Sequence, residues 1–244
     1  MQRTLARAGL GSRRSVEELI RQGRIRVNGR PAKLGNRVEP ESDVITLDGA
    51  PVAVHPDLRY FALNKPRGTT TTLRDPHAAM SLLPLLPPGP RVFPVGRLDR
   101  ESEGLLVVTN DGDLAHRLAH PRYGVEKEYL VEVEGVLSRA ETTALLRGVS
   151  LEDGPAHALA VRGLQRARGR TSLIMVMGEG RKREIRRMMD ALGHRVSRLV
   201  RVRVGPVHLG DLKPGDSRAL SMAEVMELYR VAGLTRTTLG TPSR

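Results

Sequence analysis

The sequence predicts an α+β protein with two domains, the larger of them built on a mainly antiparallel mixed sheet. Segments that alternate apolar and polar residues, as strands do, are interspersed with helical patterns, without the strict alternation of strand and helix seen in parallel α/β folds. A Pro-containing, nearly uncharged segment, 49–57, separates a short basic stretch from the rest of the chain. We therefore expect an N-terminal domain at 1–48, a linker at 49–57, a larger domain at 58–233 and a disordered tail at 234–244.

The N-terminal domain is predicted to hold two short helices and a hairpin. Ser12 is a typical N-cap for the second helix, and Asn28-Gly29 is a strong turn signal between two strands. Arg13 and Arg14 follow the cap and lie outside the apolar stripe, where the helix N-terminus itself attracts phosphate. We predict that both arginines bind a polyanion, the alternative being that they are only solvated. The first helix covers Thr4–Ala8, and the strands are Ile25–Val27 and Val44–Leu47.

The larger domain is predicted to mix five strands with two helices and a loop. The strands show either period-two alternation or short apolar runs, and the helices end at Gly or at a turn. The predicted strands are Tyr60–Leu63, Leu105–Thr109, Glu128–Val133, Ser172–Met177 and Val196–Val204; the helices are Asp113–Ala119 and Arg183–Leu192; the loop is Met80–Pro90.

The charge of the chain points to a polyanionic partner. The formal net charge is +13, and residues 162–203 hold 13 Lys or Arg and 3 Asp or Glu, a net charge of +10. Clustered basic charge is the usual electrostatic feature of nucleic-acid binding, although a salt-bridged thermostable surface is also rich in Arg. With 2% aromatic residues, base stacking cannot be widespread.

Composition also excludes several classes of site. The chain has no Cys, which excludes disulfides, thiolate metal sites and a Cys nucleophile. It shows neither a signal-peptide pattern nor an apolar run of membrane-spanning length, so we expect a soluble, cytoplasmic protein.

Asp99 is the carboxylate whose position is most informative. Asp99 ends the motif Gly96-Arg97-Leu98-Asp99. This motif follows the apolar run Val92–Val95 and precedes a second apolar run, Leu105–Val108. A carboxylate held between apolar segments is costly unless another group pairs with it. From position alone, Asp99 is either a turn-capping residue or a catalytic carboxylate.

Several motifs give the chain a resemblance to a known family. The segments Leu5–Arg14 and Gly23–Gly29 resemble the alpha-L RNA-binding domain of the ribosomal protein S-four type. Four further motifs, in the same order along the chain, resemble the pseudouridine synthases that modify ribosomal RNA. Within that family, the segments 152–156 and 195–203 are most similar to one type of large-subunit enzyme. The near alternatives are the small-subunit enzyme and the other large-subunit enzyme that carries an S-four-type domain. The four motifs are Lys65–Gly68, Gly96–Asp99, Lys127–Tyr129 and Glu179–Met188.

The resemblance implies both the reaction and the catalytic residues. The enzyme flips a uridine out of folded rRNA, breaks its N-glycosidic bond and reattaches the uracil through a ring carbon. Asp99 is implied as the nucleophile, or as the base in the competing account of the reaction. Arg186 is implied as the ion-pair partner of Asp99, the alternative being phosphate binding. Tyr129 is implied to pack on the flipped base, with an ordinary core Tyr as its alternative.

The remaining site residues are assigned to substrate binding. Ile185 is expected to form an apolar wall, and Arg97 to contact RNA near the flipped nucleotide, with a surface salt bridge as the alternative. Lys65 is expected either to have a structural role or to touch phosphate. Arg187 is assigned to the same RNA-binding surface.

No metal or cofactor is expected. His116 and His120 have a ligand-like spacing, but no third ligand accompanies them, and an isomerisation needs no redox group. The expected partner is ribosomal RNA, either folded 23S rRNA or an assembling large subunit. The protein is expected to be a monomer. The alternatives are a 16S rRNA enzyme of the same family, a non-catalytic rRNA-binding or assembly factor and, more remotely, a metal-dependent nuclease.

Overall fold

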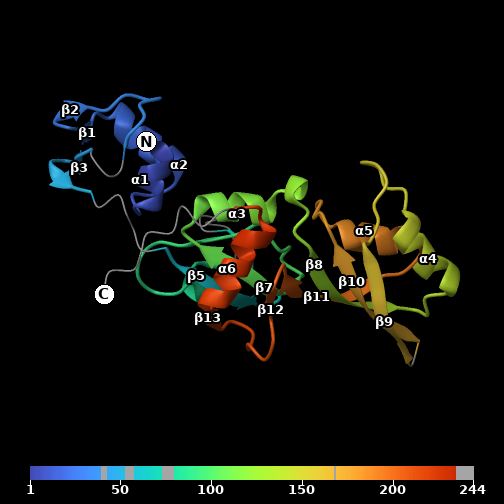
Figure 1. Ribbon diagram of the computed structural model, residues 1–244. Coiled ribbons are helices and arrows are strands. Elements are labelled where there is room, and N and C mark those ends of the chain that lie inside the picture. Colours follow the sequence, from blue (N-terminus) through green and yellow to red (C-terminus); the bar gives the residue numbers. More distant parts are fainter. Residues whose placement is uncertain (40–42, 53–57, 73–79, 168, 235–244) are drawn as a thin grey trace. The chain divides into compact units, whose positions relative to one another are not determined.

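The chain divides into two compact units, which we describe separately. In this computed structural model the described residues are 1–39, 43–52, 58–72, 80–167 and 169–234 (Figure 1). The N-terminal unit consists of residues 1–59, 88–92 and 110–112, and the C-terminal unit contains the rest. Short segments from the middle of the chain therefore belong to the N-terminal unit, which the sequence did not predict.

The N-terminal unit has the predicted helices and the predicted turn, but the strand that follows the turn is Arg30–Pro31, and the predicted second strand pairs with the other edge of Ile25–Val27. Ser12 caps the second helix by accepting a 3.1 Å hydrogen bond from the Ser15 N–H. Asn28 and Gly29 both have positive φ, as a tight hairpin turn requires, and connect two antiparallel strands. The elements are α1 (Gln2–Arg7), α2 (Arg13–Arg21), β1 (Ile25–Val27), β2 (Arg30–Pro31), β3 (Ile45–Leu47) and β4 (Ala50–Pro51), with sheet order β2-β1-β3-β4.

The edges of the predicted linker and tail differ from the structure. Strand β4 pairs with β3, so Ala50 and Pro51 belong to the N-terminal sheet rather than to a linker. Residues 53–57 of that linker lie outside the described residues. Leu234, the first residue of the predicted tail, packs partly buried against the core of the C-terminal unit, and the rest of the tail, 235–244, lies outside the described residues.

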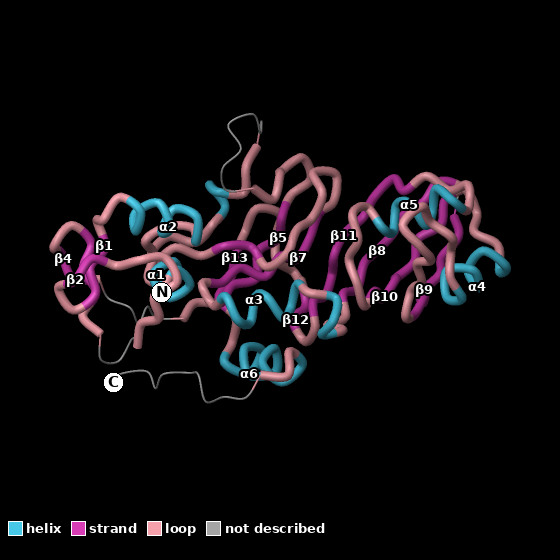
Figure 2. Tube along the Cα trace, turned by 90° about the horizontal axis from the view of Figure 1, so that it is seen from above, coloured by secondary structure: helices cyan, strands magenta, loops and turns pink. Residues whose placement is uncertain are grey.

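The C-terminal unit is built on a nine-stranded mixed sheet whose main path has the order β13-β5-β7-β11-β8-β10-β9 (Figure 2). All of its pairings are antiparallel except β7 with β11, which confirms the predicted mainly antiparallel α+β fold. The strands are β5 (Tyr60–Lys65), β6 (Phe93–Pro94), β7 (Glu103–Thr109), β8 (Lys127–Glu134), β9 (Ala160–Ala167), β10 (Arg170–Met177), β11 (Val196–Val204), β12 (Val207–His208) and β13 (Ser217–Ala219).

Gly104 makes the parallel pairing possible. It has φ of +100°, and a Cβ at this position would lie 2.4 Å from the carbonyl oxygen of Arg201 and 2.8 Å from the Arg201 nitrogen. Both atoms are backbone, so neither can move aside without shifting β11. A residue without Cβ is therefore needed where β7 meets β11.

The helices pack on the sheet and form two separate hydrophobic cores with it (Figure 1). One core lies where α3 and α6 pack on β5 and β7, and the other where α4 and α5 pack on β8, β10 and β11. The candidate site residues Leu98, Tyr129 and Ile185 belong to the second core. The helices are α3 (Gly112–Ala119), α4 (Arg139–Arg147), α5 (Glu184–Ala191) and α6 (Met222–Val231), with 3-10 turns η1 (Leu83–Leu85) and η2 (Pro121–Tyr123).

Helices α4 and α6 were not predicted, although each begins with a capping box. Ser138 and Glu141 cap α4, and Ser221 and Glu224 cap α6, with both reciprocal hydrogen bonds present in each case. Strand β9 was also missed, because most of its residues are exposed and it shows no alternation of burial.

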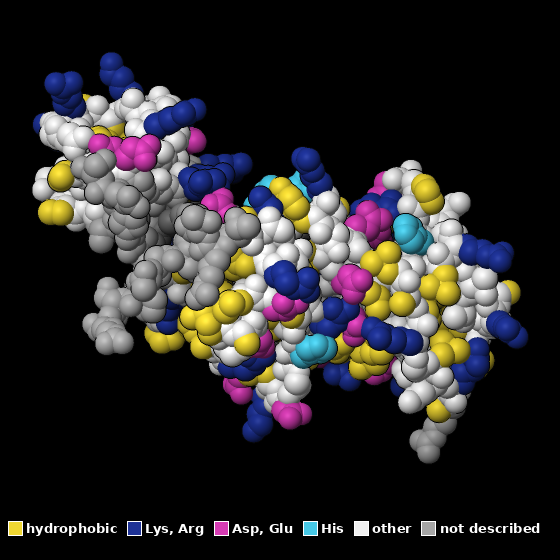
Figure 3. Space-filling model, viewed as in Figure 1, with side chains coloured by type: hydrophobic (Ala, Val, Ile, Leu, Met, Phe, Trp, Pro, Cys, Tyr) yellow, Lys and Arg dark blue, Asp and Glu magenta, His cyan; other side chains and the backbone are white. Residues whose placement is uncertain are grey.

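The basic stretch of the C-terminal unit is in large part neutralised within the fold. Arg198 pairs with Glu103 at 3.0 Å, and Arg203 with Glu128 at 2.8 Å, both from strand β11 to its neighbours. Arg162 also forms an ion pair with Glu128. Lys and Arg side chains are spread over the face seen in Figure 3, with Asp and Glu among them. The excess of charge in this stretch is thus smaller on the surface than in the sequence.

Candidate active site

Asp99 lies in a tight turn between the short strand β6 and strand β7. The Ser102 N–H donates a 3.0 Å hydrogen bond to the Asp99 carbonyl, which closes the turn. Before it, the buried Thr71 hydroxyl donates to the Leu98 carbonyl at 2.7 Å and accepts from the Leu98 N–H at 3.2 Å. The Asp99 carboxylate is half-buried and forms no ion pair or hydrogen bond with any other described residue. It is therefore held in place by backbone contacts with its carboxylate unengaged.

Arg186 reaches the same turn from helix α5. Its guanidinium donates to the carbonyl of Glu101 at 3.1 Å and to that of Val196 at 3.2 Å, and its buried Nε has no partner among the described residues. Burial lowers the pKa of Arg186, as does the nearby Arg183, while the charge of Asp99 acts in the opposite direction. The predicted direct ion pair is not formed: within the described residues, no carboxylate lies within 4.0 Å of this guanidinium. The reason is that its donors are directed at two backbone carbonyls.

Tyr129 and Ile185 form the apolar side of the site. Tyr129 is 9% exposed on β8, and Ile185 is 5% exposed on α5. Both belong to the buried cluster that also contains Leu98, the neighbour of Asp99 in the chain. The structure therefore brings together the three motifs around Asp99, Tyr129 and Arg186, which are far apart in the sequence.

Lys65 has a structural role in this fold, and its predicted contact with phosphate is not supported. Its side chain is fully buried, and its ammonium donates to the carbonyls of Thr69 at 2.7 Å and Pro66 at 3.0 Å. Burial lowers the pKa of Lys65 to about 8, opposed by the charges of Glu103 and Asp99. An ammonium without solvent access cannot bind a phosphate on the surface.

Two further buried cations, Lys127 and Arg201, were not assigned from the sequence. Arg201 is 5% exposed, and its Nε donates to the Leu105 carbonyl at 2.7 Å. Lys127 is 7% exposed, and burial, together with the charge of Arg201, lowers its pKa to about 8. Arg201 also lowers the pKa of Lys65. The sequence signals were indirect: Lys127 lies in the Lys127–Tyr129 motif, and Arg201 lies in the basic segment 195–203 that resembles the large-subunit enzymes.

The exposed arginines differ in their engagement. Arg97 is exposed and has no ion pair with another described residue, which argues against the salt-bridge alternative. Arg183 is exposed as the N-cap of α5, in the left-handed region with φ of +52°, and was missed by sequence reasoning. Arg187, by contrast, forms a bidentate ion pair with Asp153 at 2.8 and 3.0 Å. In the N-terminal unit, Arg13 and Arg14 are exposed in the first turn of α2.

The described residues contain no group of three or more His, Cys, Asp or Glu placed to hold a metal ion. His194 is engaged with the Glu134 carbonyl at 3.0 Å and with Glu141 at 3.2 Å. None of the described helices has the length and apolar character needed to cross a membrane.

Comparison with known proteins assigns both units. Residues 2–45 match the S4 domain, and residues 59–191 match the RNA pseudouridylate synthase family. An uncharacterized RNA pseudouridine synthase of Mycobacterium leprae is 43% identical over 239 residues, covering 96% of this chain and 93% of that protein. Ribosomal large subunit pseudouridine synthase B of Vibrio cholerae is 43% identical over 241 residues, covering 96% of this chain and 75% of that protein.

A solved structure supports the same assignment. The crystal structure of a pseudouridylate synthase matches with a TM-score of 0.65 and 27% identity, covering 93% of this chain and 98% of that one. Fold, sequence and domain order agree, since an S4 domain precedes the synthase domain as the N-terminal motifs predicted. The chain therefore belongs to the RNA pseudouridine synthases, a family of isomerases, and carries an N-terminal S4 domain.

Proposed function

We propose that this RNA pseudouridine synthase converts a uridine of 23S ribosomal RNA to pseudouridine, with Asp99 as its nucleophile. The observation that carries the catalytic part is the unengaged Asp99 carboxylate in a backbone-held turn, beside Arg186 and the apolar cluster of Tyr129 and Ile185. The choice of 23S rRNA is supported by two relatives that match 96% of this chain and are named ribosomal large subunit pseudouridine synthase B.

The chemistry needs a carboxylate and little else. In the proposed reaction Asp99 forms a transient bond to the sugar or the base, or acts first as a base, while the bond between N1 of uracil and the ribose breaks. A ring carbon of the uracil then bonds to the ribose and loses its proton, and in this proposal the Tyr129 hydroxyl assists that loss. Reactant and product are isomers, so no redox or group-transfer cofactor takes part.

The other residues have supporting roles in this proposal. Arg186 stabilises the ionised Asp99 through the field of its guanidinium rather than through contact, since its donors hold the carbonyls of Glu101 and Val196. Ile185 and Tyr129 supply an apolar wall for the flipped base. Arg97 and Arg183, exposed and free of described ion pairs, are suited to the phosphates next to it.

The proposal includes a cellular context. The substrate is folded 23S rRNA or an assembling large subunit, bound also by Arg13 and Arg14 of the S4 domain. A cytoplasmic location follows from that substrate. The relatives come from bacteria, and bacteria assemble their ribosomes in the cytoplasm. We propose a monomer, with rRNA as its partner.

The test is to map pseudouridines in 23S and 16S rRNA from cells with and without the gene. One pseudouridine of 23S rRNA should disappear on deletion and return with the wild-type gene, but not with the Asp99→Ala variant. Loss of a 16S site instead would replace the 23S assignment with the small-subunit alternative. An unchanged map, together with no product from purified protein on 23S or 16S transcripts, would favour a non-catalytic rRNA-binding factor.

A further inference from the structure

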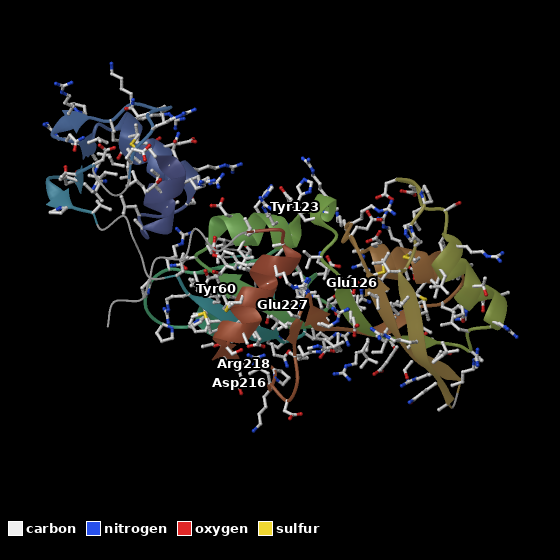
Figure 4. All side chains as sticks on the ribbon, viewed as in Figure 1. Tyr60, Tyr123, Glu126, Asp216, Arg218 and Glu227 are labelled. Atoms are coloured by element: carbon white, nitrogen blue, oxygen red, sulfur yellow. The ribbon has the colours of Figure 1, made fainter. Side chains whose placement is uncertain are left out.

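A cluster of rings lies at the C-terminal end of helix α3, outside the proposed catalytic residues. The ring centroids of His116 and His120 are 5.4 Å apart, and those of His116 and His120 lie 5.9 and 6.0 Å from the ring of Tyr123. Figure 4 shows Tyr123 beside the end of this helix. In a chain with 4 Tyr, 2 Phe and no Trp, such a grouping is unusual. We call His116, His120 and Tyr123 the ring cluster.

Two rings of the cluster, those of His120 and Tyr123, are held in place before any ligand binds. The His120 Nδ1 accepts a 3.1 Å hydrogen bond from the Arg122 N–H, which fixes that ring as the cap of the η2 turn. The guanidinium of Arg117 lies 5.1 Å from the centre of the Tyr123 ring and is itself anchored to the carbonyls of Ala232 and Gly233. Since the rings of His120 and Tyr123 are already held, little conformational entropy of these two side chains remains to be lost when a flat ligand stacks on the cluster.

The two histidines are exposed to solvent, and the ring of Tyr123 beside them is partly buried. His116 and His120 are exposed, whereas Tyr123 is half-buried and packs against the core shared by α3 and α6. The His116 side chain forms no hydrogen bond with any described residue. Packing therefore accounts for Tyr123, and capping of the η2 turn accounts for His120, but neither accounts for the exposed imidazole of His116.

The ring cluster adjoins the turn that carries the candidate nucleophile. A Cβ at Gly96 would lie 3.8 Å from the Cβ of Ala119, the last residue of α3 and the neighbour of His120. Gly96, Arg97 and Ala119 are all exposed, and the close approach of Gly96 to Ala119 joins the end of the helix that carries both histidines to the segment of Arg97, two residues before Asp99. In the space-filling view, His side chains and Lys or Arg side chains share the surface above α3 (Figure 3).

We propose that the ring cluster is a stacking site for an unpaired RNA base next to the target uridine, with Arg97 contacting the backbone between the two. This inference rests on the proposed function in one respect, that RNA is the substrate. Histidine and tyrosine rings are among the side chains on which splayed RNA bases stack, with arginine planes often beside them. A base that is paired in a helix has both faces covered and cannot bind in this way. The site therefore selects RNA in which the nucleotides around the uridine are single-stranded.

The test compares single-stranded with double-stranded RNA. The probes are an oligoadenylate of about ten nucleotides and a duplex of the same length, titrated against the full-length protein. His116→Ala removes an exposed ring without removing a hydrogen bond, and His116→Phe keeps a ring but removes its polar atoms. His157→Ala is the matched control, because His157 is an exposed histidine elsewhere in the same unit.

The expected result is specific to the single strand. His116→Ala should weaken oligoadenylate binding about fivefold or more, His116→Phe should restore it, and neither should change duplex binding. The slope of log affinity against log salt should stay the same, because no phosphate contact is lost. Wild-type affinity for oligoadenylate in His116→Ala, an equal loss on the duplex, or no rescue by His116→Phe would each overturn the proposal.

The outcome is separable from that of the proposed function. If the wild-type protein forms no pseudouridine in rRNA but His116→Ala still loses single-strand affinity, the stacking site stands and the proposed function fails. If pseudouridine is formed at the wild-type rate by His116→Ala and the single-strand affinity is unchanged, the stacking site fails alone.

Discussion

The guanidinium of Arg186 donates a 3.1 Å hydrogen bond to the carbonyl of Glu101, two residues after Asp99. This contact joins helix α5 to the turn that presents the candidate nucleophile, and the second bond to the Val196 carbonyl joins both to the start of β11. Arg186 thus fixes the position of Asp99 through the backbone while acting on its carboxylate only through space. The two roles, positioning and electrostatics, come from one side chain.

Replacing Asp99 should abolish the reaction without disturbing RNA binding. The carboxylate has no described hydrogen bond or ion pair, so Asp99→Asn leaves the surrounding contacts intact, and we expect turnover to fall by at least about 10³-fold. Single-turnover assays on rRNA and a binding titration measure the two effects separately. Asp190→Asn, an exposed carboxylate on α5, is the control. Product formation by Asp99→Asn at the wild-type rate would rule out the nucleophile role.

Arg186→Lys should lower both turnover and stability. A lysine ammonium cannot reproduce the planar fork that reaches the carbonyls of Glu101 and Val196, so one of them is left without its donor. We expect the free energy of unfolding to fall by about 2 kcal/mol and kcat by about 10- to 100-fold, with KM little changed. Urea denaturation and steady-state kinetics provide the measurements, with exposed Arg195→Lys as the control. A variant with normal kcat would show that Asp99 does not depend on Arg186.

Gly104→Ala should destabilise the C-terminal unit severely. The new methyl group would lie 2.4 Å from a backbone oxygen of Arg201, and the residue would also retain a φ of +100° that L side chains rarely adopt. We expect a loss of about 3 kcal/mol or more in urea denaturation. Gly193→Ala has a positive φ as well but open space around it, so it separates the two effects and should cost about 1 kcal/mol. Equal losses in the two variants would mean that the close approach to β11 is relieved at little cost.

The buried Lys127 should make stability depend on pH above neutrality. Its pKa of about 8 in the folded protein lies below the ordinary value of 10.5, so between these pH values the unfolded chain binds more protons than the folded one. The free energy of unfolding therefore rises with pH across that window, and below it the buried charge is a constant penalty. Lys127→Met should be about 2 kcal/mol more stable than the wild type at pH 7.

The pH series supplies the internal check for Lys127. The advantage of Lys127→Met should shrink as the pH rises from 8 toward 10.5, because the wild-type lysine becomes neutral in the folded state. Urea denaturation at a set of pH values measures this, with exposed Lys213→Met as the control. A constant difference between variant and wild type at every pH would contradict the depressed pKa.

Local signals in the sequence predicted much of the fold. The cap at Ser12, the turn at Asn28-Gly29 and the alternation of β8 depend on neighbours in the chain, and each is confirmed. Strand β9 was missed because it is a strand only through its pairing with β10; most of its side chains face solvent, so its sequence shows no alternation. The capping boxes of α4 and α6 were present in the sequence and could have been recognised.

The site shows the same division. The sequence motifs alone predicted the residues of the site, because the residue types that the chemistry requires occur in the family's order along the chain. These residues are Asp99, Tyr129, Ile185 and Arg186. Only the tertiary structure decided what each basic residue does: Arg186 and Lys65 are buried on backbone carbonyls, Arg187 is paired with a carboxylate, and Arg97 is exposed. The physical reason is that desolvation and ion pairing depend on which distant segments surround a side chain. The sequence identifies an arginine or lysine but does not show whether its charge is buried, paired or exposed.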